Sequence, residues 1–463
     1  MAIVMKFGGT SVADAAAFKN VARIVSWEHK VPRVVVVSAM SGVTDDLLNA
    51  TSIAATGDAE QAFASLENAF KRHEAAAHDL LSNPAREEFL KQLREASDEI
   101  ADLLKQFAEK PSERKALQDA VVSFGEILSS SLLAAVLDQR HVRARHVDAR
   151  RCIITDEDHT CAGPLMIESS ARAKNELLPV LEEGIVAVMG GFIGATRTGV
   201  TTTLGRGGSD YTAALIGAMI HVSELQIWTD VSGVLTADPR VVPHAYTIDR
   251  LSYSEAAELA YFGAKVLHPK TIQPAIENSI PVRICNSRIP EAAGTLVGPQ
   301  AETSPRTIKA IAHKKGVTIM QITSARMLGA YGFLRALFEV FDRHRTVIDV
   351  VTTSEVSVSL SLDEASALPS IVEELERFGT VRVEKGQATI CLVGEGLRGT
   401  PGVAARAFST ISDINVSLIS QGASSINFTF VVDEGRVQEV VTRLHEEFFS
   451  HKLVRTAQEN ECF

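Results

Sequence analysis

Long hydrophobic runs and an excess of basic residues are both missing from this 463-residue chain. The longest apolar run, 185–195, has 11 residues, well below the ~20 that span a bilayer. Lys and Arg number 46 against 57 Asp and Glu, for a net charge of −11. That balance gives no electrostatic footprint for nucleic acid or for an anionic membrane. We therefore expect neither a nucleic acid nor a membrane as a partner. A function that acts on a small molecule is favoured instead.

Cysteine is also scarce. The chain has five, with no CxxC pair that would suggest zinc or redox chemistry. The first ten residues hold Lys6 and two glycines where a signal peptide needs an apolar segment. We expect a cytoplasmic protein with reduced thiols.

The first 300 residues alternate between strand-like and helix-like stretches, which predicts an α/β domain with a mostly parallel sheet. The strand-like runs include 34–37, 185–189, 225–229 and 280–285. Helical periodicity interrupts this rhythm over about 54–118, broken at Asn83-Pro84, and predicts an inserted helical hairpin. We place the domain at 1–295 and a Pro- and Gly-rich linker at 296–312.

An internal repeat with an offset near 70 residues follows the linker. Each copy shows strand, turn, helix, two strands and a further helix, over 313–384 and 385–463. Two βαββαβ units of this size resemble ACT domains, which bind small amino acids. The alternative is a pair of ferredoxin-like domains that only dimerise.

Glycine-rich turns carry the first chemical signal. The strand-like start runs through Lys6 into Gly8-Gly9-Thr10-Ser11 and then a helix. Such a turn lets backbone N–H groups approach phosphate oxygens, so we expect an ATP phosphate site. It is not a Walker A loop, because the lysine precedes the glycines. Taken alone, a plain glycine turn beside a lysine would explain it.

A second turn, TTTLGRGGSDY over 201–211, holds Arg206 and Asp210 at another helix start. Asp210 has a plain alternative role as a helix cap. Two more small-residue loops, 38–42 and 190–194, also end predicted strands. Sites in α/β sheets form where strands end, so these loops predict one shared site.

Taken in order, KFGGTS, VSAMSGVTD, SFGE, GGFIG, TTTLGRGGSDYTAAL, WTDVSGVLTADPR and FGAKVLHP, followed by the two repeats, resemble aspartate kinase over essentially the whole chain. The likeness is greatest to the single-function, lysine-sensitive type. It implies the amino acid kinase fold, an α/β/α sandwich, and a carboxyl phosphotransferase. The implied reaction converts ATP and L-aspartate to ADP and 4-phospho-L-aspartate, the first step toward lysine, threonine and methionine.

The resemblance also implies roles for single residues. Lys6 would neutralise charge on the transferring phosphoryl group, and Asp210 would hold Lys6 or organise the nucleotide. Arg206 would clamp the substrate α-carboxylate, and Glu126 would pair with its ammonium group; the plain alternative for Glu126 is a solvated helix position. The remaining implied substrate contacts are Ser38, Thr44, Phe192 and Ser209.

ATP and Mg²⁺ are the implied cofactors. The implied nucleotide contacts are Lys6, Gly8, Gly9, Thr229, Asp230, Leu235, Arg240, Lys265 and Val266. Leu235 departs from the aromatic residue often found there, and Arg240 and Lys265 could instead be surface cations. Mg²⁺ is usually held by phosphates with few protein groups, so no metal ligand is assigned. No arrangement of His or Cys suggests a metal centre, and His268 reads as structural.

The first repeat would bind an amino acid effector, by resemblance L-lysine. The matching positions are Met327, Gly332, Phe333, Leu334, Val347, Ile348 and Asp349. Asp349 would pair with the effector ammonium, whereas Ala330 and Val347 replace expected serines. Pairing of ACT domains across chains implies a homodimer or a dimer of dimers.

Three other functions share part of this sequence pattern. A glutamate or acetylglutamate kinase would share the glycine loops, but the double repeat and the pair Glu126 and Arg206 argue against it. A fused homoserine dehydrogenase would need several hundred more residues, so we expect the single-function form. A catalytically silent amino acid sensor is disfavoured because the chain keeps four charged residues implied for the site, which are Lys6, Glu126, Arg206 and Asp210.

Overall fold

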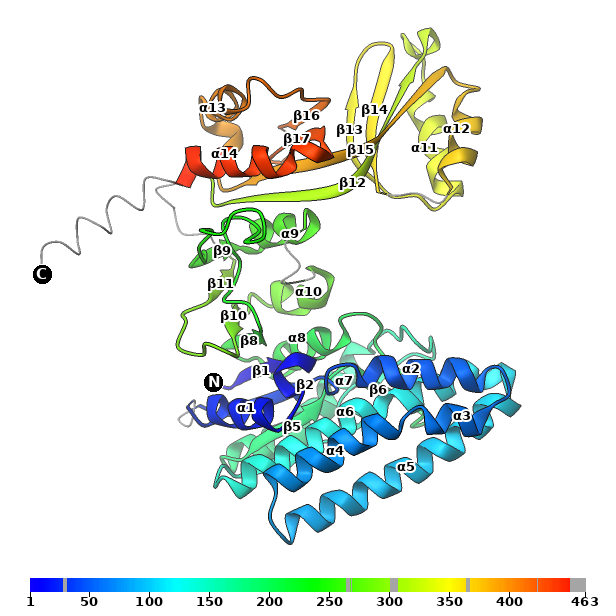
Figure 1. Cartoon of the computed structure of the whole chain (residues 1–463), viewed down its shortest axis with the longest axis vertical. Helices are drawn as coiled ribbons and strands as arrows, with labels where there is room; N and C mark the ends of the chain where they lie inside the picture. The colour runs from blue at the N-terminus through cyan, green and yellow to red at the C-terminus, as the bar shows by residue number, and fades with distance from the viewer. Residues whose placement is uncertain are drawn as a thin grey trace, which may run out of the picture. The chain divides into compact units, whose positions relative to one another are not determined.

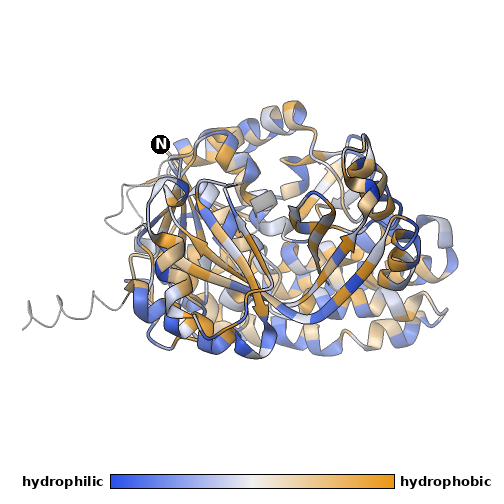
Figure 2. Cartoon of the chain, turned by 90° about the horizontal axis from the view of Figure 1, so that it is seen from above, coloured by the Kyte–Doolittle hydropathy of each residue, from blue (hydrophilic) through white to orange (hydrophobic). Residues whose placement is uncertain are grey.

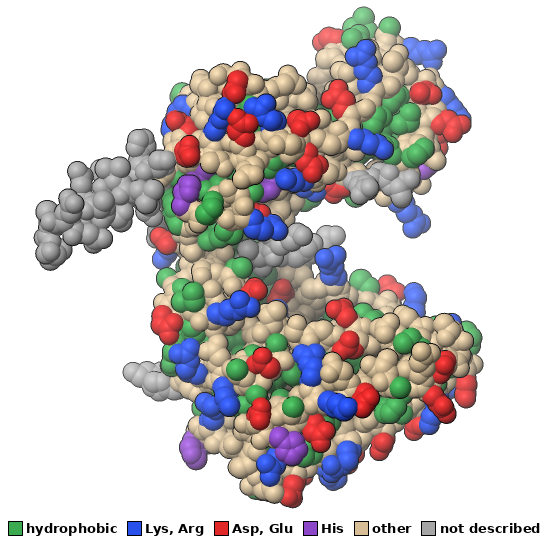
Figure 3. Space-filling view, in the orientation of Figure 1, with side chains coloured by type: hydrophobic (Ala, Val, Ile, Leu, Met, Phe, Trp, Pro, Cys, Tyr) green, Lys and Arg blue, Asp and Glu red, His purple; other side chains and the backbone are tan. Residues whose placement is uncertain are grey.

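The structure is a computed structural model that describes residues 1–27, 31–263, 267, 269–299, 307–363, 367–422 and 424–449. It forms two compact units (Figure 1). The first comprises Met1–Val234, Asp249–Tyr253 and Val266–Gln300, and the second comprises Leu235–Ile248, Ser254–Lys265 and Ala301–Phe463. On the face drawn in Figure 3, basic and acidic side chains are interspersed over each unit.

An eight-stranded sheet forms the centre of the first unit, in the order β3-β5-β2-β1-β8-β10-β11-β9. Its strands are β1 (Ile3–Phe7), β2 (Arg33–Val37), β3 (Ala144–His146), β5 (Val186–Gly190), β8 (Glu224–Thr229), β9 (Arg250–Ser252), β10 (Val282–Asn286) and β11 (Thr295–Gly298). Neighbours from β3 to β10 are parallel, and β11 pairs antiparallel with β10. The continuous apolar runs of β2 and β5 are fully buried, as expected for parallel strands covered on both faces.

Helices cover both faces of this sheet. Met5 and Phe7 of β1 belong to one hydrophobic core with α1 (Ala15–Trp27) and α6 (Arg114–Gln139). On the other face, Val4 lies against Gly217 of α8 (Gly208–Ile220), and α7 (Met166–Glu182) and α10 (Pro269–Glu277) flank α8. In the view of Figure 2 the strands are mostly hydrophobic, whereas the helices mix hydrophobic and hydrophilic residues. The predicted α/β/α sandwich is confirmed.

The inserted helical region lies between β2 and α6 and runs beside α6 (Figure 1). After α2 (Val43–Ala54) come α3 (Ala59–Ala64), α4 (Glu67–Leu80) and α5 (Ala85–Glu109). The chain breaks near Pro84 as expected, but a further short helix, α3, precedes the expected pair. Asp58 starts α3 by accepting a hydrogen bond from the N–H of Gln61.

One stretch of the described chain, Pro111–Gln139, is long and apolar enough to cross a membrane by length and composition. Within the protein, 78% of its most apolar window is buried. The core helix of a folded domain passes the same test, so this finding is weak evidence for a membrane span.

The second unit is built on a six-stranded antiparallel sheet in the order β13-β14-β12-β15-β17-β16. Its strands are β12 (Ala310–Thr323), β13 (Ile348–Thr353), β14 (Ser357–Leu362), β15 (Thr380–Val393), β16 (Leu418–Gln421) and β17 (Asn427–Asp433). Its helices are α9 (Tyr253–Tyr261, of which Tyr253 falls in the first unit), α11 (Phe333–Arg343), α12 (Leu368–Leu375), α13 (Val403–Thr410) and α14 (Val437–Phe449). Two hydrophobic cores divide this unit, one around α11 and α12 and one around α13 and α14.

Strand β12 takes part in both halves of that sheet. Its residues 317–323 pair with the first half of β15, while residues 310–315 pair with residues 388–393 of β15. The predicted repeat boundaries at 313–384 and 385–463 stay a prediction. The structure adds that the half-sheet built mainly from the second repeat includes residues 310–315, the start of β12, whose later residues belong to the first repeat.

Residues 235–248 also belong to the second unit, although the sequence places them inside the 1–295 domain. Ala237 and Val242 are buried in the same core as Ile390 and Phe430. The backbone N–H of Ile311 donates to the carbonyl of Thr236 at 2.8 Å. Burial of these apolar side chains explains why this loop packs with the six-stranded sheet.

Candidate active site

The carboxyl ends of β1, β2 and β5 meet at one edge of the sheet, because these strands are parallel neighbours. A pocket of about 450 Å³ opens there. Its walls include Lys6 of β1, loop residues after β2 and β5, and the start of α8. The lining residues are Lys6, Ser38, Thr44, Leu48, Gln118, Val122, Glu126, Thr160, Phe192, Thr203 and Gly205 to Asp210.

A short ion pair lies in this pocket. The Nζ atom of Lys6 is 2.6 Å from Oδ1 of Asp210, and their side chains are 12% and 21% exposed. Asp210 stands in the first turn of α8, so the helix N-terminus faces the same place. The pair holds the lysine cation at the pocket wall while leaving it accessible to a ligand.

Glu126 lies almost wholly buried on α6, with 3% of its surface exposed. Its Oε1 atom accepts a hydrogen bond from the N–H of Ala39 at 3.1 Å, whereas Oε2 has no partner among the described residues. Burial raises the pKa of this carboxyl to about 8. An unsatisfied acceptor in a pocket is costly and points to a cationic or donor ligand.

The turn that starts α8 depends on its glycines. Gly207 caps the helix with φ of 75°, in the left-handed region that favours glycine. A Cβ on Gly208 would lie 2.6 Å from the ring of Phe192, so the two loops can approach only without that side chain. This packing places Arg206 at the pocket rim, where its exposed guanidinium makes no ion pair with a described residue.

All eight residues implied for catalysis and substrate binding line this pocket. They are Lys6, Ser38, Thr44, Glu126, Phe192, Arg206, Ser209 and Asp210. Their individual roles stay predictions. The sequence reasoning missed Leu48, Gln118, Val122, Thr160 and Thr203. Leu48 follows Thr44 by four residues, and Gln118 and Val122 precede Glu126 by eight and four, so helical spacing could have found these three.

Asp119 supports the pocket from behind and is fully buried. It accepts hydrogen bonds from the Thr203 hydroxyl at 2.6 Å and from the backbone N–H of Thr160 at 3.0 Å. Nδ1 of His159 lies 2.8 Å from the same carboxylate. Asp119 therefore joins α6 to two segments, each of which lines the pocket.

Only part of the residue set implied for nucleotide binding can be located in the first unit. A Cβ on Gly8 would lie 3.6 Å from Nζ of Lys6, and one on Gly9 would meet the Ala39 carbonyl at 2.9 Å. Thr229 ends β8 beside β1, and Asp230 follows it, at the same sheet edge.

Leu235 and Arg240 belong to the second unit, where Arg240 is paired with Asp238 at 2.7 Å. Lys265, Val266 and His268 lie outside the described residues.

The residues implied for the effector lie in the turn before α11, in the first turn of α11 and at the start of β13, all in the second unit. Gly332 caps α11 with φ of 80°, Met327 and Phe333 pack at the edge of its core, and Val347 is 71% exposed. Leu334 is partly exposed on α11, and Ile348 begins β13.

The carboxylate of Asp349 is engaged within the chain. Its side chain is 4% exposed, and Nζ of Lys314 lies 3.3 Å from Oδ2. The Tyr261 hydroxyl donates to Oδ1, and Lys314 also pairs with Asp363 at 2.6 Å. Burial, followed by the negative charge of Asp363, raises the pKa of Asp349 to about 7. The predicted role of Asp349 in effector binding stays a prediction.

Comparison with known proteins agrees with this fold and site. A model of the amino acid kinase family matches residues 1–286, and a model of the ACT domain matches residues 390–448. The lysine-sensitive aspartokinase 3 of Escherichia coli is 38% identical over 457 residues, covering 96% of this chain and 99% of that protein. Aspartokinase 1 of Arabidopsis thaliana chloroplasts is 39% identical over 461 residues, covering 96% and 80%.

Solved structures agree as well. The E. coli aspartokinase III in complex with aspartate and ADP has a TM-score of 0.78 at 39% identity, covering 97% of this chain and 100% of that chain. The Clostridium acetobutylicum aspartate kinase has a TM-score of 0.83 at 28% identity, covering 96% and 100%. The sheet, the glycine turns and the charged pocket are thus those of an amino acid kinase. Within that class the chain belongs to the aspartokinase family, and the resemblance read from the sequence is confirmed.

Proposed function

We propose that the pocket transfers the γ-phosphoryl group of ATP to the β-carboxylate of L-aspartate, giving 4-phospho-L-aspartate. The observation that carries this proposal is that the Lys6–Asp210 pair and the unsatisfied Oε2 of Glu126 line one pocket. The pair offers a cation for a phosphoryl group, and Glu126 offers an acceptor for an ammonium group.

Recognition of the amino acid uses both of its charged groups. The Arg206 guanidinium binds the α-carboxylate, and Glu126, once ionised, accepts from the ammonium group. Ser38, Thr44, Phe192 and Ser209 complete the substrate wall. The β-carboxylate is then directed toward Lys6.

The chemistry needs no base, because a carboxylate is ionised at neutral pH. A β-carboxylate oxygen forms a bond to the γ-phosphorus while the bond to the bridging oxygen breaks and ADP leaves with that electron pair. Lys6 stabilises the charge on the transferring group, and Asp210 holds Lys6 in place.

Nucleotide binding involves the backbone of Gly8 and Gly9 together with Thr229 and Asp230. Further contacts come from Leu235, Arg240, Lys265 and Val266. Bound Mg²⁺ would supply charge neutralisation on the phosphates. Among the described residues no group of three or more His, Cys, Asp or Glu is placed to hold a metal. Mg²⁺ bound with a nucleotide is usually held by phosphate oxygens and few protein groups.

Regulation acts through the second unit. L-lysine binds at Met327, Gly332 to Leu334 and Val347 to Asp349 and lowers turnover, and the ACT domains pair across chains into a dimer or a dimer of dimers. The enzyme works in the cytoplasm. A fall in turnover requires that lysine bind an inactive arrangement more tightly than the active one.

The test measures ADP release with ATP and Mg²⁺ for L-aspartate, L-glutamate, N-acetyl-L-aspartate and succinate, with hydroxylamine to trap an acyl phosphate. We expect turnover and trapped hydroxamate with L-aspartate only, since the other three lack either the ammonium group or the right length. Lysine and threonine are titrated in parallel. Absence of turnover with every acid would refute the proposal and favour an amino acid sensor. Equal turnover with succinate would refute the role of Glu126.

A further inference from the structure

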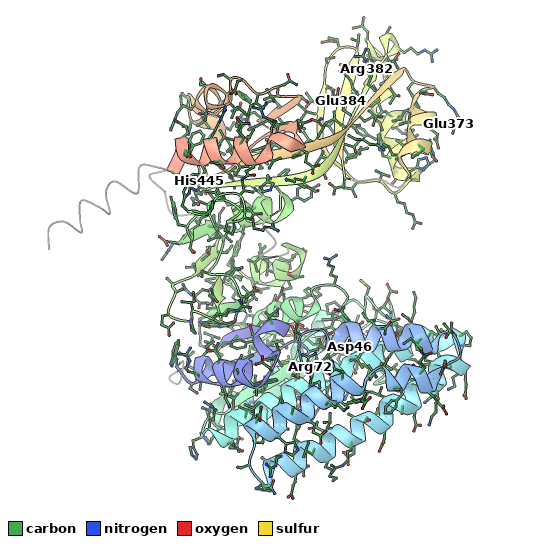
Figure 4. The ribbon with its side chains drawn as sticks, in the orientation of Figure 1. Asp46, Arg72, Glu373, Arg382, Glu384 and His445 are labelled. Carbon is green, nitrogen blue, oxygen red and sulfur yellow. The ribbon has the colours of Figure 1, made fainter. Side chains whose placement is uncertain are left out.

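The inserted helices reach the active-site loops through one arginine. Arg72 lies on α4 (Figure 4). Its Nη1 group donates a hydrogen bond to the carbonyl of Ser41 at 2.8 Å, and its Nη2 group donates to the carbonyl of Ala13 at 3.1 Å. One guanidinium therefore bridges two separate stretches of backbone.

These two stretches continue the loops that build the site. Ala13 ends the turn that begins at Gly8 and Gly9, after β1. Ser41 lies in the loop that begins at Ser38, after β2.

The two loops already touch, because a Cβ on Gly9 would lie 2.9 Å from the Ala39 carbonyl. No rigid secondary structure joins them at this point; β1 and β2 end at Phe7 and Val37. Arg72 fixes their far ends relative to each other.

A cation bound to carbonyl oxygens could serve stability alone. Two features favour positioning. Both acceptors belong to site loops, and no ion pair with a described carboxylate holds the guanidinium elsewhere. The Ser41 residue is itself exposed, so water could satisfy its carbonyl without the arginine.

We propose that Arg72 is a positioning residue that sets the separation of the phosphate turn and the substrate loop. The inference rests on the proposed function, since it assigns phosphate to the first loop and the amino acid to the second. Phosphoryl transfer depends mainly on placing donor and acceptor in line, and a misplacement near 1 Å costs about 10²-fold in rate. The inserted helices thereby act on the geometry of the reaction and not only on folding.

Arg114 supplies a matched control. It begins α6 and makes the same kind of clamp, with Nε donating to the Phe107 carbonyl at 3.2 Å and Nη2 donating to the Ala55 carbonyl at 3.1 Å. Its guanidinium also stacks on the Phe107 ring. Both acceptors lie at helix ends away from the pocket lining.

The experiment compares R72A, R72K and R114A in the full chain. Turnover, the KM values for aspartate and ATP, the thermal midpoint, and the calorimetric Kd values for aspartate and ADP are measured. We expect R72A to lose about 10²-fold in kcat/KM and to weaken both ligands, with partial recovery in R72K and with added guanidinium ion. R114A should lower the thermal midpoint about as much as R72A does, while its kcat/KM stays within about threefold of the unchanged protein.

If R72A matches R114A in kinetics and in both Kd values, the positioning role is refuted. If R72A does not fold, the same comparison is made with R72K, whose kcat/KM must then fall well below that of R114A. Absence of turnover in the unchanged protein would refute the proposed function instead. In that case the Kd values alone decide. Loss of ADP binding in R72A but not in R114A would support the positioning role of Arg72, and equal ADP binding in the two variants would refute it.

Discussion

The buried carboxyl of Glu126, which we propose binds the substrate ammonium group, should destabilise the folded protein at alkaline pH. Burial raises the pKa of its carboxyl from the ordinary value of 4.5 to about 8. At about 1.4 kcal/mol for each pH unit, that rise corresponds to an upper limit of about 5 kcal/mol. Below pH 4.5 the group is protonated in both states and costs nothing. Between pH 4.5 and 8 the unfolded chain ionises first, so stability falls as pH rises, and above pH 8 the loss is complete.

The variant E126Q removes this titration and keeps an oxygen for the Ala39 N–H. We expect its thermal midpoint to exceed that of the unchanged protein by about 3 °C or more at pH 8.5, and the gain to vanish near pH 4.5. Its KM for aspartate should rise at least about tenfold, because a charge-assisted hydrogen bond is lost. In the unchanged protein this KM should fall as pH rises toward 8, since the ammonium group needs the ionised carboxylate.

Thermal unfolding at several pH values and steady-state kinetics provide the assay, with the exposed Glu109 changed to Gln as the control. A gain in E126Q that does not depend on pH would refute the reasoning about burial. An unchanged KM for aspartate would separate Glu126 from substrate binding.

Three further outcomes follow from the geometry. K6M should lower kcat by at least about 10²-fold and leave Asp210 without its partner, measured by ADP release; a loss under tenfold would contradict the electrostatic role. G190A should raise the KM for aspartate and lower the thermal midpoint, because the new Cβ would lie 2.9 Å from Cβ of Glu126; unchanged values would contradict that contact. K314M should lower the lysine concentration for half-inhibition by about tenfold, since Lys314 competes for Asp349. Titration of turnover with lysine checks this, and an unchanged or higher concentration would show that Lys314 is no competitor.

Much of the site could be predicted because its residues follow strand ends. Parallel strands bring their carboxyl ends to one edge, so Lys6 and the loop at Ser38 were expected together. Glu126 required the family resemblance, since a glutamate on a helix is ordinarily exposed. Asp210 had three possible roles in the sequence, as a helix cap, as the partner of Lys6 or as an organiser of the nucleotide, and the structure shows the contact with Lys6.

The supporting contacts could not be predicted. Arg72 binds backbone carbonyls, and these leave no pattern in the sequence. Asp119 meets donors that lie 41 and 84 residues away, at Thr160 and Thr203. Thr160 has a positive φ of 77°, a backbone conformation that threonine rarely adopts and that its residue type therefore does not predict.

The sharing of β12 between two half-sheets has a consequence for how the regulatory region can be taken apart. A cut between residues 384 and 385 would sever β15 in the middle and leave residues 310–315 without the neighbour they pair with. The first half of the sheet is therefore one continuous stretch, residues 317–387, inserted between the two strand segments 310–315 and 388–393 of the second half. A self-contained version of the second half would join residue 316 to residue 387, because Lys315 and Ala388 already face each other as antiparallel partners. In evolutionary terms, the first half can be gained or lost as one unit, whereas the second half is split in the chain.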